Sequence, residues 1–418
     1  MKRSKVSPGD RALILTLGIS SDSKEGSIVD ALMIDIAAFK PRRVVMASTD
    51  LSRPVADTLA ARLQPERIEA EHLSLPSAHD LPGIFGAVRG VIFRLLAEGF
   101  RNENIAVNYA SGTKVMSSGL TLAAVFGACG SLRYVRSSVR QPAEERLIST
   151  STGPIFAHRD ILLAILLGSE LRFRAARHLL ENIQADFLTE DERQLSADLI
   201  ALFRAYSERE SFNFGRFLEL YGQVSFAHRE LAKFRLSPEG LAAVKRLDRD
   251  VAQGRPSRLL CVELFNSAQR RRHEGEYSDG MTRLYRALEL LAQQRLRDDY
   301  AINADDVDAH RVPPRYRPDF EALRSPQDGR IRLGLRKSYE LLYRLDDELG
   351  RSFEEDPQMT ARLDERRATM LAHGVAPASK ELDAAFDGWV TGFFMKHIED
   401  FAGQCRRLQF PWLAPHGA

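Results

Sequence analysis

Short apolar runs of strand length alternate with helix-spaced apolar residues over the N-terminal third of the chain. Apolar residues recur at the spacing of a helix face in residues 28–39, 55–63, 81–100 and 115–126. The strand-like runs occupy residues 12–17, 42–48, 67–75, 104–110, 131–138 and 145–152. This alternation predicts a mostly parallel, doubly wound, Rossmann-like sheet. Its last two strands form a closing pair that could run antiparallel.

Helical patterning alone continues from residue 160 onward. Helix spacing is found in residues 161–182, 191–206, 214–234 and 238–251, and the Gly and Pro of 252–258 mark a boundary. A second helical part begins at residue 259 and is interrupted by the Pro-rich segment 311–318. The predicted fold class is therefore α/β plus all-α. We expect three parts, at residues 1–158, 159–255 and 256–418.

Two stretches of the last part combine arginines with helical spacing. In residues 277–296 a stripe of leucines predicts the core helix of a bundle. The run RRRHE, residues 270–274, predicts a solvated basic face rather than an RNA contact.

Composition narrows the function only a little. Lys plus Arg number 59 and Asp plus Glu 57, so net charge selects no partner. Cys129, Cys261 and Cys405 have no metal-ligand spacing, and none of the ten histidines stands in an H-E-x-x-H pattern, so we expect no metal. Reduced cysteines predict a cytoplasmic protein. The most apolar run, residues 161–167, is too short to span a bilayer, which predicts no membrane segment.

The sequence NYASGTKVMSSGL, residues 108–120, joins a predicted strand to a predicted helix. Gly112 would let backbone N–H groups approach an anion, the helix N-terminus favours negative charge, and Lys114 adds a full charge. The alternative is an ordinary turn with Thr113 or Ser111 as the N-cap. A similar polar loop, residues 19–27, follows the first strand at the same sheet edge. Together they favour a phosphate-bearing ligand, although no Walker A, G-x-G-x-x-G or G-x-S-x-G pattern is present.

A second candidate site lies in ERRATMLAHG, residues 365–374. If residues 365–373 form one helix, Arg366 and His373 share a face about 10 Å apart along the axis, and Arg367 points away. Gly374 and Pro377 are stop signals, so His373 would lie at a helix end that favours its protonated form. This pair could cleave a phosphodiester without metal. The alternative is two solvated arginines and a capping histidine.

In this order, the motifs resemble the accessory ribonucleases of type III CRISPR systems. Those proteins join an N-terminal CARF domain, which senses cyclic oligoadenylate, to a C-terminal HEPN ribonuclease domain. The CARF resemblance rests on LILTLGISSDS and NYASGTKVMSSGL, where Ser111 replaces the first Gly of the family's Gly-Gly-Thr-Lys loop. The HEPN resemblance rests on LYRALELLAQ followed by LAHG, and on Arg366 and His373 with six residues between them. Many members have Asn where this chain has Arg367.

The resemblance implies roles for each part. The CARF domain, residues 1–158, would bind cyclic oligoadenylate as an allosteric activator, without a cofactor; the HEPN domain, residues 256–418, would cut single-stranded RNA. The 2′-hydroxyl would attack the adjacent phosphate, which Arg366 holds, while His373 positions or protonates the leaving oxygen. Arg367 would stand in the place of the Asn, and the protein would be a homodimer. The implied ligand-binding residues are Gly18, Ile19, Ser20, Ser21, Ser111, Gly112, Thr113 and Lys114.

Three alternatives stay open on the sequence. The first is a sensor whose effector domain is inactive, because the family's Asn is missing. The second is a ring nuclease whose CARF domain degrades the cyclic ligand. The third is a helical nucleic-acid-binding protein with an unrelated nucleotide sensor.

Overall fold

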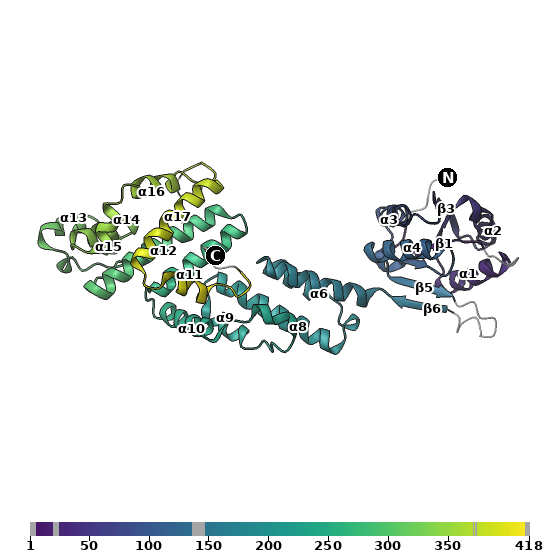
Figure 1. Cartoon of the computed structure of the whole chain (residues 1–418), viewed down its shortest axis with the longest axis horizontal. Coiled ribbons are helices and arrows are strands. Elements are labelled where there is room, and N and C mark those ends of the chain that lie inside the picture. The colour runs from purple at the N-terminus through teal and green to yellow at the C-terminus, as the bar shows by residue number, and fades with distance from the viewer. Residues whose placement is uncertain (1–5, 20–24, 136–146, 371, 373, 414–418) are drawn as a thin grey trace. The chain divides into compact units, whose positions relative to one another are not determined.

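The computed structural model describes residues 6–19, 25–135, 147–370, 372 and 374–413 (Figure 1). The chain divides into two compact units. The sheet unit comprises Met1–Asp160 and Ile183–Thr189, and the helical unit comprises Ile161–Asn182 and Glu190–Ala418.

The sheet unit is built on six strands among its described residues, in the order β3-β2-β1-β4-β5-β6 (Figure 1). β1 to β5 are parallel, and β6 is antiparallel to β5. The predicted doubly wound sheet and its antiparallel closing pair are therefore confirmed. The strands are β1 Ala12–Thr16, β2 Arg43–Ser48, β3 Glu69–Ser74, β4 Ile105–Asn108, β5 Ser131–Val135 and β6 Leu147–Ser151.

Two hydrophobic clusters sandwich the sheet because successive strand residues face opposite sides. In β1, Leu13 and Leu15 join a cluster with helices α1 and α2, whereas Ala12 and Ile14 join one with α3 and α4. Fully burying each leucine or isoleucine stabilises the fold by about 1.5–3 kcal/mol. The helices are α1 Glu25–Phe39, α2 Arg53–Leu63, α3 Leu81–Ala97 and α4 Lys114–Phe126, with short 3-10 helices at Asp50–Ser52, Asn102–Asn104 and Ala185–Phe187.

The direction of winding reverses at β1. β1 pairs with β2 on one side and with β4 on the other. The loops that follow β1 and β4 therefore leave adjacent strands at the carboxyl edge of the sheet. In open α/β sheets this switch point is where ligands bind.

Two helices of the helical unit are shorter than the spacing of apolar residues predicted. The predicted helix at residues 161–182 is two helices, separated near Leu171, whose φ is +63°. The predicted helix at 214–234 ends at Tyr221, and Arg229–Phe234 is a 3-10 helix. Apolar spacing persists across both breaks because Leu171 and Val224, which lie in them, are buried.

The helices from α6 onward are α6 Gly153–Ser169, α7 Phe173–Glu181, α8 Glu190–Glu210, α9 Phe214–Tyr221, α10 Pro238–Ala252, α11 Arg258–His273, α12 Tyr277–Tyr300, α13 Arg317–Glu321, α14 Leu335–Arg344, α15 Glu348–Glu354, α16 Met359–Arg367, α17 Lys380–His397 and α18 Phe401–Leu408. Further short 3-10 helices lie at Ala309–Arg311 and Pro314–Tyr316. In α12 the leucines of the predicted stripe are buried, so the core-helix prediction is confirmed.

A buried ionic network joins α8 to α11. Arg209 Nη2 donates to Glu263 Oε2 at 2.8 Å, and Arg270 Nη2 donates to Glu263 Oε1 at 2.7 Å. Arg270 also pairs with Glu210. The carboxylates raise the pKa of Arg270 although burial opposes its charge. The prediction of a solvated basic face at residues 270–274 is therefore wrong for Arg270, which is fully buried.

Candidate functional site

The loops after β1 and β4 touch through two glycines. A Cβ atom at Gly18 would lie 2.7 Å from the Cα of Gly112, closer than any side chain tolerates. Gly112 has a φ of +94°, which glycine adopts without strain. The predicted ligand loops therefore meet at the switch point of the sheet.

Ser111 ties the two loops together. Gly18 N–H donates to Ser111 Oγ at 3.2 Å, and Thr16 Oγ1 donates to the Ser111 carbonyl at 2.5 Å. Ser111 is only 9% exposed. Its hydroxyl therefore supports the loop from inside. A glycine here, as in the resembling family, would lack this link.

Thr113 is the N-cap of α4, as one of the two sequence alternatives expected. Its Oγ1 accepts from Met116 N–H at 3.2 Å and donates to the Ala78 carbonyl at 2.7 Å. Lys114 opens the helix and is exposed, and no ion pair to it exists within the described chain. A capped helix start and an unpaired ammonium thus stand beside Gly112, a combination that suits an anion. The cap and the anion site are therefore compatible.

A buried polar network that was not predicted lies beneath this loop. Asp35 accepts from Asn108 Nδ2 at 2.6 Å and from Arg133 Nε at 2.5 Å. Asn108 Oδ1 accepts from Ala110 N–H at 2.9 Å, where the chain leaves β4. The network fixes the end of the strand. Its signal in the sequence is Asp35 itself, a carboxylate inside an otherwise apolar stretch of helix.

Of the predicted ligand residues, the structure places six around this junction: Gly18, Ile19, Ser111, Gly112, Thr113 and Lys114. Ser20 and Ser21 lie outside the described residues. Ile19 is exposed, so it adds an apolar group beside the two loops.

A Ser–His pair at the neighbouring strand ends does not form a nucleophile and base. Ser48 Oγ lies 2.6 Å from His72 Nε2, and Arg53 Nη1 lies 2.9 Å from His72 Nδ1. Because arginine can only donate, Nδ1 accepts, and the ring proton of the neutral histidine is on Nε2. Burial and Arg53 lower the pKa of His72. The ring therefore donates to Ser48 and cannot take its proton.

The second candidate site begins where α16 ends. The condition of one helix over residues 365–373 is not met, because α16 stops at Arg367. Thr369 Oγ1 donates to the Arg366 carbonyl at 2.8 Å, and Met370 N–H donates to the Ala376 carbonyl at 2.9 Å. These bonds take the chain out of the helix. Seven-residue helical phasing therefore does not relate Arg366 to position 373.

Gly374 closes this turn rather than a helix. A Cβ atom there would lie 2.0 Å from the carbonyl oxygen of Ala368. Gly374 N–H donates to the Thr369 carbonyl at 3.1 Å. His373 itself lies outside the described residues.

Arg366 and Arg367 have different surroundings. The guanidinium carbon of Arg366 lies 4.3 Å from the centre of the Tyr285 ring, a cation–π contact. Arg366 is half-buried, and burial lowers its pKa. The side chain of Arg367 is 61% exposed and lies 3.9 Å from Asp364. Arg366 is therefore held in place, and Arg367 is a surface residue.

Tyr285 is a site residue that sequence reasoning did not identify. It stands beside the buried stripe of α12 and turns its ring to α16. Burial and then Glu289 raise its pKa, so the phenol is neutral near pH 7. The ring therefore holds Arg366 without neutralising its charge. A lone tyrosine on the flank of an apolar stripe carries no sequence signal for this role.

The described residues offer neither a metal-binding cluster nor a membrane-spanning helix. No three His, Cys, Asp or Glu side chains among these residues gather closely enough to hold a metal ion. No helix in the described part of the chain has the length and apolar character to cross a bilayer.

A comparison with protein families bears on the helical unit. The family model of the Csm6 HEPN domain matches residues 249–396. This segment is therefore similar to a Csm6 HEPN domain. Arg366, Arg367, His373 and Tyr285 all lie within it. None of the curated proteins is similar enough in sequence to count as a match.

Solved structures extend the likeness in fold to nearly the whole chain. Csm6 of Enterococcus italicus, solved with cyclic hexa-2′-fluoro-hexa-dAMP bound, superposes with a TM-score of 0.53 at 13% identity. The comparison covers 96% of this chain and 99% of that one. A type III CRISPR defence DNA nuclease activated by cyclic oligoadenylate aligns over 59% of this chain and 35% of its own. Its TM-score of 0.26, at 16% identity, is too low to support an inference. The predicted fold class, a Rossmann-like sheet followed by a helical part, is confirmed.

Proposed function

We propose that this protein is a ribonuclease that cyclic oligoadenylate activates and that cuts single-stranded RNA without a metal ion or cofactor. The observation that carries the proposal is the state of Arg366. Within the HEPN domain, this arginine is half-buried against Tyr285, seven positions before His373. A cation held rigidly and partly dehydrated binds a developing phosphate charge more strongly than a solvated one does.

The junction of the β1 and β4 loops is the proposed ligand site. The phosphodiesters of cyclic oligoadenylate suit the capped start of α4 and the ammonium of Lys114. Because the Ser111 hydroxyl already accepts from Gly18 N–H, this loop would bind phosphate through backbone N–H groups and Lys114. The likeness in fold to a Csm6 solved with such a ligand supports this choice.

Two parts of the proposal concern organisation. The CARF domain is proposed to span residues 1–158, a helical connecting region residues 159–255, and the HEPN domain residues 256–418. A homodimer would share one cyclic ligand between two CARF domains, because a two-fold ligand fits a two-fold axis.

The proposed reaction is an internal transesterification of RNA. The 2′-hydroxyl oxygen bonds to the adjacent phosphorus and gives its proton to solvent water, while the bond from phosphorus to the 5′-oxygen breaks. Arg366 neutralises the phosphate as charge builds, and His373 gives a proton to the leaving 5′-oxygen. The products are a 2′,3′-cyclic phosphate and a 5′-hydroxyl, and no water is consumed.

The test is cleavage of a fluorescent single-stranded RNA by the purified protein. Cyclic tri-, tetra- and hexa-adenylate are supplied in turn, with and without EDTA, and the RNA ends are identified by mass spectrometry. We expect cleavage with one of these ligands, unchanged by EDTA, and 2′,3′-cyclic phosphate ends. His373→Ala should abolish cleavage and keep ligand affinity.

Three outcomes would contradict parts of this proposal. No cleavage with any ligand, despite ligand binding, would identify a sensor with an inactive effector. Loss of activity in EDTA, restored by one metal, would refute the metal-free mechanism. Breakdown of the ligand that survives His373→Ala but not Lys114→Ala would identify a ring nuclease.

A further inference from the structure

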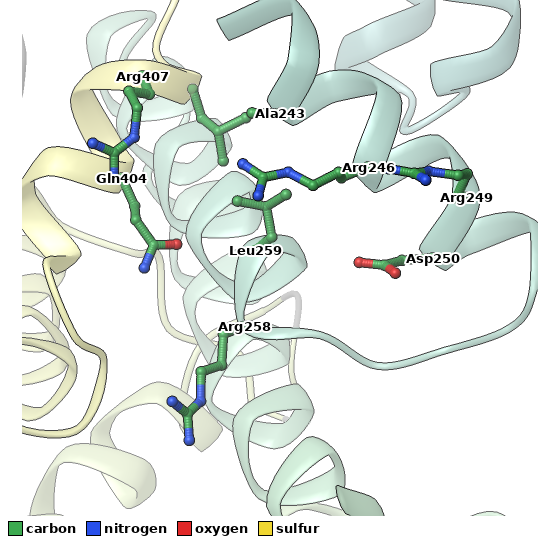
Figure 2. A pocket seen from close by; sticks show the side chains of 9 residues that line it. Ala243, Arg246, Arg249, Asp250, Arg258, Leu259, Gln404 and Arg407 are labelled. Carbon is green, nitrogen blue, oxygen red and sulfur yellow. The ribbon is translucent and has the colours of Figure 1, made fainter. Parts of the chain in front are cut away.

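A cavity of about 480 Å³ lies between α10, α11 and α18 of the helical unit. Figure 2 shows arginine side chains reaching it from all three helices. Arg246 and Arg249 come from α10, Arg258 from α11 and Arg407 from α18. Asp250 is the one acidic residue among the residues that line it. Four positive charges thus face one negative charge.

The positive charge of these arginines is only partly neutralised by neighbouring side chains. Within the described chain, neither Arg246 nor Arg249 forms an ion pair or side-chain hydrogen bond. Arg258 Nε reaches only an amide oxygen, Oε1 of Gln294, at 3.4 Å. Arg407 pairs with the exposed carboxylate of Asp400 at 2.7 Å. Because four arginines line the cavity and two of them have no acidic or hydrogen-bonding partner in the described chain, the cavity favours an anionic occupant.

The fold does pair arginines where their role is structural. Arg209 and Arg270, in the same unit, each bond to the carboxylate of Glu263. α10 contains three basic residues and three acidic residues, so its charges balance along the helix. Arg246, Arg249 and Asp250 line the cavity, which leaves one net positive charge of α10 on that side.

A second basic cavity, of about 770 Å³, adjoins the first. The two are joined through consecutive residues, Asp250 with Val251 and Leu259 with Leu260. Arg255, Arg286 and Arg297 line the second cavity. Arg286 directly follows Tyr285, the residue that holds Arg366. Two of these arginines have partners, Arg255 with Asp298 at 3.7 Å and Arg286 with Glu289 at 2.5 Å. The second cavity therefore lies along α12, the helix that also carries Tyr285, and is less basic than the first.

The chemistry of the lining indicates what would bind. None of the residues that line either cavity is aromatic, so bases would find no ring on which to stack. Guanidinium groups bind phosphate with bidentate geometry, and contacts to phosphate carry no information about base sequence. The surface therefore fits a phosphodiester backbone better than a base or an apolar small molecule.

We propose that the cavity of Arg246, Arg249, Arg258 and Arg407 binds the phosphate backbone of the RNA substrate outside the catalytic centre. This inference rests on the proposed ribonuclease function. The cavity would bind the RNA backbone next to the cleaved bond, whatever the base sequence. Long RNAs would gain affinity from it, and RNAs too short to reach it would not.

The test uses the full chain and the double variant Arg246→Gln/Arg249→Gln. The control is Arg174→Gln/Arg204→Gln, which removes the same charge from exposed arginines of α7 and α8 that have no ion pair in the described chain and line neither cavity. Binding of a labelled RNA of about 20 nucleotides is measured by fluorescence anisotropy over a range of salt, in a His373→Ala background. Cleavage of the same RNA, and of one too short to reach the cavity, is measured with His373 intact.

Loss of two phosphate contacts should reduce the steepness of log affinity against log salt by about 1.4. If the two proteins bind equally at about 1 M salt, the double variant then binds roughly 25-fold more weakly at about 0.1 M. KM for the long RNA should rise with kcat unchanged, because uniform binding is lost. The double variant should cleave the short RNA at the rate of the unsubstituted protein. The control variant should cleave both RNAs at that protein's rates. Single-stranded DNA of equal length should compete with the long RNA for the cavity.

Failure of the cavity proposal can be told apart from failure of the proposed ribonuclease function. If the unsubstituted protein cleaves RNA and the double variant keeps its affinity and salt slope, the cavity is not an RNA site and the proposed function stands. If the unsubstituted protein neither binds nor cleaves RNA, both proposals fail. A defect that is equal for short and long RNA would place the effect in the catalytic centre and refute the cavity proposal.

Discussion

Replacing Tyr285 tests whether its ring positions Arg366 for the reaction. Tyr285→Leu keeps an apolar side chain beside α16 and removes the ring face that holds the guanidinium. Tyr285→Phe keeps the face and removes only the hydroxyl. We expect the leucine variant to slow RNA cleavage and the phenylalanine variant to be nearly as active as the unsubstituted protein.

The size of the effect follows from the burial of Arg366. Cation–π contacts are worth about 0.5–1 kcal/mol when exposed and about 2 kcal/mol when dehydrated. Arg366 is half-buried, so we assign roughly 1–1.5 kcal/mol to this contact. If that free energy is expressed in the transition state, kcat/KM falls roughly five- to tenfold in Tyr285→Leu.

The assay is the initial rate of RNA cleavage at saturating cyclic oligoadenylate. Melting temperature and ligand affinity are measured for each variant, so that a folding defect is recognised. Tyr316→Leu is a matched control. The ring of Tyr316 lies 4.6 Å from the guanidinium carbon of Arg344 in the same unit, a contact of the same kind with no part in the proposed reaction. Its cleavage rate should be unchanged.

Two results would refute this reasoning. An unchanged rate in Tyr285→Leu would mean that the ring does not position Arg366. Equal loss in Tyr285→Phe and Tyr285→Leu would mean that the hydroxyl, and not the ring face, matters.

Further predictions concern both units. Arg366→Ala should abolish ligand-stimulated cleavage, whereas Arg367→Ala should retain a substantial part of the rate, because Arg367 is exposed; the opposite ranking in the RNA assay would contradict our assignment. Lys114→Ala should weaken cyclic oligoadenylate binding by roughly 1.5–3 kcal/mol, and unchanged affinity by calorimetry would move the ligand site elsewhere. Ser111→Gly should weaken binding less, because it loosens the loop without removing charge; a larger loss than in Lys114→Ala would show that the hydroxyl contacts the ligand. Glu263→Gln should destabilise the helical unit by about 3–5 kcal/mol in denaturant unfolding, because two buried arginines lose their carboxylate; an unchanged midpoint would contradict the packing of that network.

The sheet unit was predictable from the sequence because its core is built on regular periods. In β1 alternate residues enter two separate clusters, so the strand is apolar throughout. Each helix that covers the sheet buries one stripe of apolar residues. The position of the ligand loops then follows from chain order alone, since adjacent parallel strands end at one edge.

The surroundings of the candidate catalytic residues were less predictable because their geometry depends on contacts that hydrophobic periodicity does not reveal. Thr369 ends α16 by bonding back to Arg366, and local periodicity does not reveal this bond. Tyr285 gains its role from Arg366, which belongs to a helix much further along the chain. Arg270 is buried only because Glu210 and Glu263 neutralise it. In each case the deciding partner is absent from the local pattern.

The ionic network between α8 and α11 determines where this protein can be divided. Both arginines donate to Glu263, and each has a further acceptor near the end of the chain. Arg209 donates to the carbonyl of Leu408, and Arg270 donates to Gln409 Oε1 at 3.1 Å. A fragment that begins at residue 256 would lack Arg209 and Glu210, and one that ends at residue 396 would lack Leu408 and Gln409. Either fragment would leave buried charges or polar groups unpaired. A hybrid protein that carries a different sensor should therefore retain at least residues 209–409, so that the whole network is transplanted.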